Sequence, residues 1–146
     1  MLFMETKFDH ISAYKCLNAI GNSLDLHTML IEVISTFVHY SDALGGHYYE
    51  SSSHTPIVSV GEMITITDIP PIQDGPYRIH TYDQKNVLQL PTHQGHFLFL
   101  YENHELEETA FLLSSFGLKL SNAIEACKNV EKLRNTKSEF NPSSRC

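Results

Sequence analysis

The residues of this chain most able to carry chemistry are its nine histidines. His93 and His96 stand three positions apart across a predicted turn, a spacing that can bind a transition metal if two further ligands come from elsewhere. We favour the alternative that His93 is a solvated turn residue and His96 begins a strand. Four other histidines lie on predicted strands or loops: His47, His54, His80 and His104. None of them has a carboxylate at a spacing that suggests a shared site, and the sequence does not single out any of them as a haem ligand.

The sequence also lacks the arrangement of residues that nucleophilic catalysis requires. Ser51–Ser53 lie near His54, but a serine nucleophile needs a base held by a third group and an oxyanion site, which a serine-rich hairpin tip does not supply. Neither common type of glycine-rich phosphate loop occurs. The three cysteines, Cys16, Cys127 and Cys146, are far apart and form no C-x-x-C pair, which argues against a disulfide framework or a zinc site. The sequence therefore predicts a protein that is not an enzyme.

Length and charge limit the remaining possibilities. The 146 residues, 42% of them hydrophobic, suffice for one domain with a substantial core. Ten Lys and Arg against 17 Asp and Glu give a net charge of −7, without a basic stripe, so we expect no direct nucleic-acid partner. The chain has neither an apolar run of eighteen residues nor a secretion leader, so we expect a cytoplasmic protein without a membrane partner.

Three segments have helical periodicity. Apolar residues recur at three- and four-residue steps from Lys7 to Asn22 and again from Leu26 to Tyr40, where Asp25 stands as a predicted N-cap. A third helix is expected without interruption from Glu105 to Arg134. Its apolar residues fit a heptad, and six of them are predicted to form a dimer helix: Leu113, Phe116, Leu120, Ala123, Cys127 and Val130. The alternative is that this stripe packs on the domain's own sheet.

Between the second and third helices the pattern becomes extended. Six strands are expected, at Ala43–Glu50, Pro56–Val60, Met63–Thr67, Tyr77–Tyr82, Asn86–Leu90 and His96–Tyr101. The adjacent Gly45 and Gly46 indicate a bulge or a place where a helix or ligand approaches the backbone, packing being the commoner reason. Residues 136–146 are polar and include a proline, so we expect a domain over 1–135 followed by a disordered tail.

The order of these elements and the wording of three segments resemble the GAF family. Ser23–Leu30 resembles the entry to that family's second helix, and Asp42–Gly46 resembles the small-residue start of its first strand. The run from Leu88 through Tyr101 to Ala126 resembles the paired strands and closing helix that end most members. The resemblance covers about residues 7 to 130.

This resemblance implies an α+β fold: a six-stranded antiparallel sheet with the N- and C-terminal helices on one face and a ligand pocket on the other. It also implies a sensory domain that dimerises through the helices and signals to an output domain such as a histidine kinase, a nucleotide cyclase or a transcription regulator. The N-K-F-D-E signature of cyclic-nucleotide-binding members is missing. Ser41–Tyr101 contains no cysteine for attaching a bilin or reducing methionine sulfoxide, so the sequence does not identify the ligand or any cofactor.

Aromatic and polar residues of the expected strands are the candidates for pocket walls. Tyrosine hydroxyls can orient a ligand within an apolar cavity, so the predicted binding residues are Tyr48, His80, Tyr82 and Gln89. The leading hypothesis is a small-molecule sensor that forms a homodimer. The alternatives are a dimerisation or scaffold module without a ligand, favoured by the short, proline-rich segment between Gly61 and Asn86, and a metal- or haem-dependent sensor.

Overall fold

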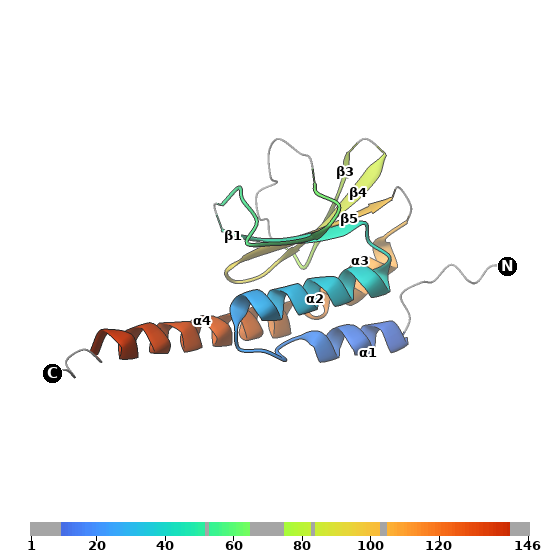
Figure 1. Ribbon diagram of the computed structural model, residues 1–146. Coiled ribbons are helices and arrows are strands. Elements are labelled where there is room, and N and C mark those ends of the chain that lie inside the picture. Colours follow the sequence, from blue (N-terminus) through green and yellow to red (C-terminus); the bar gives the residue numbers. More distant parts are fainter. Residues whose placement is uncertain (1–9, 52, 65–74, 83, 103–104, 141–146) are drawn as a thin grey trace.

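One open antiparallel sheet with helices on a single face forms the body of the protein (Figure 1). The computed structural model describes residues 10–51, 53–64, 75–82, 84–102 and 105–140, with side chains described as far as residue 135. The described strands are β1 (Gly45–Glu50), β2 (Val58–Gly61), β3 (Arg78–Tyr82), β4 (Lys85–Pro91) and β5 (Gly95–Glu102). The described helices are α1 (His10–Ala19), α2 (Leu26–Ser41), α3 (Glu107–Ser114) and α4 (Gly117–Phe140).

The strand order in the sheet is β2-β1-β5-β4-β3, and every neighbouring pair is antiparallel. The α+β class is thus confirmed, but the expectation of six strands is wrong, because the described residues form a sheet of five strands. Of the third expected strand, Met63 and Ile64 are irregular, and 65–67 lie outside the described residues. Gly61 explains the difference, since its φ of 80° turns the chain away after β2, and Ile64 then packs against a sheet face.

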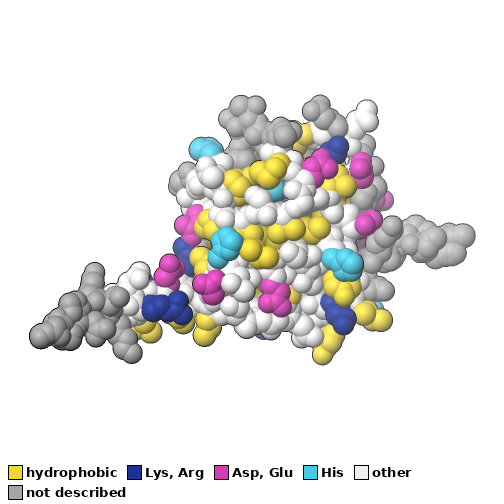
Figure 2. All heavy atoms as spheres, in the orientation of Figure 1, with side chains coloured by type: hydrophobic (Ala, Val, Ile, Leu, Met, Phe, Trp, Pro, Cys, Tyr) yellow, Lys and Arg dark blue, Asp and Glu magenta, His cyan; other side chains and the backbone are white. Residues whose placement is uncertain are grey.

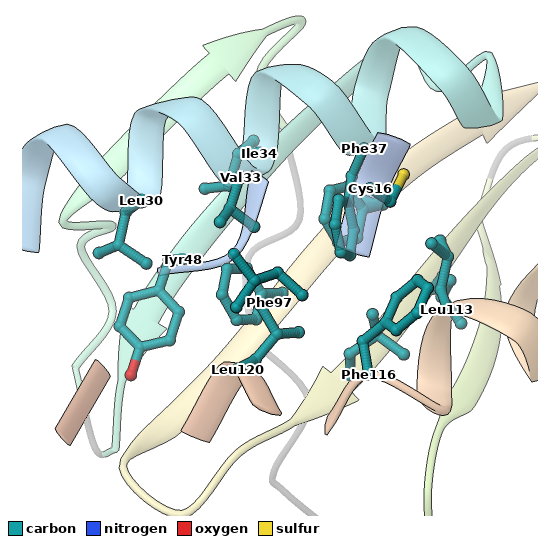
Figure 3. Close-up of a cluster of buried hydrophobic side chains, with 14 of the residues drawn as sticks. Cys16, Leu30, Val33, Ile34, Phe37, Tyr48, Phe97, Leu113, Phe116 and Leu120 are labelled. Carbon is teal, nitrogen blue, oxygen red and sulfur yellow. The ribbon is translucent and has the colours of Figure 1, made fainter. Parts of the chain in front are cut away.

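The helix-covered face of the sheet holds the main hydrophobic core, shown in Figure 3. Phe37 of α2 stacks on Phe99 of β5, with ring centroids 5.8 Å apart, and contacts Phe116 at 5.9 Å. Gly46 of β1 lies directly under α2, because a Cβ there would come within 2.7 Å of Ile34 Cγ2. The packing explanation for this glycine is confirmed.

The second helix forms as its sequence predicts. Its apolar stripe faces the core, and Asp25 caps its start by accepting a hydrogen bond from the Thr28 backbone N–H at 3.0 Å. Its end is fixed by Asp42, whose left-handed φ of 64° lets its N–H reach the Val38 carbonyl.

The closing helix differs from the uninterrupted one that was predicted. It is broken at Ser115 and Phe116 into α3 and α4. The hydroxyls of Ser114 and Ser115 donate to the carbonyls of Phe111 and Leu112 at 2.8 and 2.6 Å, local bonds that compete with helix continuation. Gly117 then begins α4, which extends to Phe140, five residues into the segment expected to be a disordered tail.

The predicted dimer stripe is largely occupied by the domain itself. Its members Leu113, Leu120 and Cys127 are at most 1% exposed, and Phe116 is 9% exposed. All four belong to the core cluster, while Ala123 and Val130 are half-buried. The four buried side chains, together with Ala123, therefore pack on their own subunit, as the alternative interpretation of the stripe had it.

Candidate functional site

A row of polar side chains crosses the second face of the sheet, opposite the helices. Side chains alternate between the two faces of a strand, so the neighbours of core residues in β1, β4 and β5 point to this second face. Six residues of this face, one or two from each strand, form what we call the polar row. They are His80, Gln89, His96, Tyr49, His47 and Ser59.

Three strands are joined by one hydrogen-bonded chain within the polar row. His80 Nε2 lies 3.1 Å from Gln89 Oε1, and Gln89 Nε2 lies 2.8 Å from His96 Nδ1. An amide oxygen only accepts, so His80 donates through Nε2. An amide nitrogen only donates, so His96 accepts at Nδ1 and carries its proton on Nε2. The bonds thus run in one direction from β3 through β4 to β5.

Hydrogen bonds also fix His47 in the other half of the polar row. His47 Nε2 lies 3.1 Å from the carbonyl of Glu62 and must donate to it, while His47 Nδ1 lies 2.9 Å from Ser59 Oγ. Tyr49 lies between the two halves, with ring centroids 5.5 Å from His96 and 6.5 Å from His47. The row therefore continues across β1 to β2.

Burial keeps two histidines of the polar row, His47 and His96, uncharged. His47 is 0% exposed, Gln89 2% and His96 4%. Burial lowers the pKa of His47, although its bond to Glu62 partly opposes the shift, and burial also lowers the pKa of His96. Both rings are consequently neutral at pH 7, which agrees with the acceptor role of His96 Nδ1 and leaves His47 Nδ1 to accept a hydrogen bond from the Ser59 hydroxyl.

Apolar side chains frame the row on the same face. Val87, Leu98 and Leu100 pack with Tyr49 in a second, smaller cluster, against which Leu44, Ile64 and Tyr82 also lie. Glu62 and Ile64 belong to the segment that follows β2, which closes part of this face. A buried apolar frame with a few oriented polar groups is typical of small-molecule sites, and neutral rings and an amide suit an uncharged polar ligand group.

Three of the four predicted ligand-binding residues lie together on this face. His80 bonds to Gln89, and the rings of His80 and Tyr82 are 6.2 Å apart. Tyr48 lies on the opposite face, where its ring packs on Phe97 at 4.7 Å in the main core. Because alternation sends adjacent residues to opposite faces, Tyr48 and the other three do not line one site.

Sequence reasoning missed four members of the polar row, His47, Tyr49, Ser59 and His96, as binding residues. A signal for the first two was present in Gly46. A glycine that lies against a helix fixes residues 46 and 48 on the helix-covered face and residues 47 and 49 on the other. The burial of His96 had no such signal, since it depends on Gln89 of the neighbouring strand.

The histidine pair that suggested a metal is split by the fold. His96 is buried and bonds through Nδ1 to Gln89, whereas His93 is exposed in the β4–β5 turn. Over the described ranges, no group of three or more His, Cys, Asp or Glu side chains is placed to hold a metal ion. In the same part of the chain, no helix has both the length and the apolar character needed to cross a bilayer.

Compared with models of known protein families and with curated proteins, the chain matches none. The fold and the polar row are therefore the basis for any functional assignment.

Proposed function

We propose that this chain is a GAF-like sensory domain that binds a small molecule at the polar row. The observation that carries the proposal is the hydrogen-bonded chain His80–Gln89–His96 on the sheet face opposite the helices, in which Gln89 and His96 are buried and His80 is half-buried. A core alone does not require three polar side chains there. A satisfied buried network holds its polar groups in fixed positions, and fixed polar groups are what orients a ligand in a binding site.

Signal output in this proposal passes through the helices to a dimer partner or to a cytoplasmic output domain, such as a histidine kinase, a nucleotide cyclase or a transcription regulator. The buried stripe of α3 and α4 does not offer the dimer surface. Other apolar side chains of the helices are 62–68% exposed and supply it instead: Ile11, Tyr14, Phe111 and Leu118. Large exposed apolar side chains are common at protein interfaces.

Ligand binding is tested with protein purified gently from cells, by native mass spectrometry, and by a thermal-shift screen against uncharged polar metabolites. A ligand of the polar row stabilises the wild-type protein, and Gln89→Leu abolishes that shift. The matched control His39→Gln changes an exposed histidine of α2 and retains it. If no ligand is found, or if Gln89→Leu binds as the wild type does, the scaffold alternative is favoured instead.

The dimer is tested separately by sedimentation velocity over a range of concentrations. Leu118→Glu is expected to weaken self-association, because it places a charge in an apolar contact surface. Asn129→Glu adds the same charge at another exposed position of α4 and serves as the control. A wild-type protein that stays monomeric at the highest concentration contradicts this part of the proposal.

A further inference from the structure

A pocket of about 190 Å³ lies on the helix side of the molecule, away from the polar row. We call it the junction pocket, because three segments meet there: the α1–α2 connection with the start of α2, the residue before β2, and α4. Its floor is apolar, formed by Leu24, Leu26, Ile57 and Cys127. This volume is below the ~300 Å³ where drug-sized sites begin, so it suits a compact metabolite.

Charged groups of both signs line the same pocket. Arg134 and Glu131 come from α4, and Asp25 comes from the opposite wall. Hydrogen bonds from the Thr28 side chain and then its backbone lower the pKa of Asp25, and the nearby Arg134 adds to this, so the carboxylate is charged at pH 7. Among the residues that the structure describes, Arg134 and Glu131 have no hydrogen bond and no ion pair within 4 Å.

We propose that the junction pocket binds a small zwitterion with an apolar side chain, of the size and chemistry of an aliphatic amino acid. The carboxylate of the ligand pairs with Arg134, its ammonium pairs with Glu131 and Asp25, and its side chain covers the apolar floor. Arg134 and Glu131 have no hydrogen-bond or ion-pair partner among the described residues, Asp25 carries a charge beyond its hydrogen bonds to Thr28, and Leu24 is 55% exposed, so each part of such a ligand finds a complementary group.

Because the pocket lies between α4 and the α1–α2 connection, binding of such a ligand affects the orientation of α4. Helix α4 passes the α1–α2 connection and continues beyond the rest of the domain, and acidic and basic side chains gather along this end of it (Figures 1 and 2). A zwitterion that bridges Arg134 and Asp25 ties the projecting helix to the α1–α2 connection. Binding therefore favours one orientation of α4, the element that continues towards any following segment.

The test uses leucine and two analogues, each lacking one charged group: 4-methylpentanoate and 3-methylbutylamine. Binding is followed by ¹⁵N–¹H NMR shifts in full-length protein. We expect leucine to shift the amides of the α1–α2 connection and of α4, and both analogues to bind at least about fivefold more weakly. Arg134→Gln and Glu131→Gln are each expected to weaken leucine binding by about fivefold. Lys119→Gln and Glu125→Gln change exposed charges elsewhere on α4 and leave it unchanged.

Equal binding of the two analogues and leucine, unchanged binding in Arg134→Gln, or shifts confined to the sheet face would each overturn the proposal. Gln89→Leu leaves this site intact, so its outcome is separate from that of the polar row.

Discussion

Removing the central amide of the polar row tests whether the row acts as one connected unit. Gln89→Leu keeps the side-chain size but removes both hydrogen bonds, the one to His80 and the one to His96. His96 is 4% exposed, so its Nδ1 is left without a partner away from water, which costs about 1–3 kcal/mol. His80 is half-buried and reaches water, so it adds little. We expect a net loss of about 2 kcal/mol.

Urea unfolding measures this loss. With a slope of about 2 kcal/mol per molar, the expected change moves the midpoint by about 1 M. Asn122→Leu replaces an exposed amide on α4 and serves as the control, with an expected change within about 0.5 kcal/mol.

A double-mutant cycle separates the network from ordinary packing. His96→Leu alone removes the acceptor of the hydrogen bond from Gln89 Nε2, whereas the Gln89→Leu/His96→Leu double variant removes both groups of this bond. The double variant is therefore expected to be more stable than the sum of the single losses by about 1 kcal/mol or more. Additivity within about 0.3 kcal/mol, or a Gln89→Leu variant as stable as the wild type, would refute the reasoning.

Three further predictions concern Gly46, the two buried histidines and the Asp25 cap of α2. Gly46→Ala is expected to destabilise by about 1–3 kcal/mol in urea, because its methyl group would meet Ile34, while Gly117→Ala has open space and is expected to be neutral or stabilising. Burial lowers the folded-state pKa of His47 and His96 below that of the unfolded chain, so their contribution is complete above about pH 6.5 and falls below it. Urea midpoints from pH 7.5 to 5.5 should decline, and less steeply in a His47→Gln/His96→Gln variant. Asp25→Ala removes the α2 cap and should lower the melting temperature by about 3–5 °C, whereas Asp25→Ser, which can also cap, should restore most of it.

The helices near the N-terminus could be predicted because their signals are local. The stripe after Asp25 and the cap itself lie within one segment, and the structure confirms both. The break in the closing helix was missed although its cause is also local. Heptad spacing continues through Ser114, Ser115 and Gly117, and periodicity alone does not weigh serine hydroxyls that bond back to the helix.

The faces of the sheet were harder to predict because they depend on long-range register. His80 and Tyr82 share a face through simple alternation, and this part of the candidate site follows from the sequence. Tyr48 was placed with them because its residue type does not distinguish it from Tyr49, and its face depends on Gly46 two residues earlier. The choice between the two is made by α2, which lies over Gly46 and so assigns residues 46 and 48 to the core.

Strand β1 contacts both the polar row and the helices. In the proposed function, it carries the effect of ligand binding from one face of the sheet to the other. His47 and Tyr49 belong to the polar row, while Gly46 of the same strand lies against Ile34 and has no side chain to absorb a displacement. At the end of the strand, Glu50 forms an ion pair with Lys128 of α4, next to Cys127 of the junction pocket. Close-packed interiors move between discrete arrangements rather than deforming gradually. A ligand that shifts β1 therefore moves α2 through Gly46 and α4 through Lys128, and Lys128→Gln removes the second route while leaving the first in place.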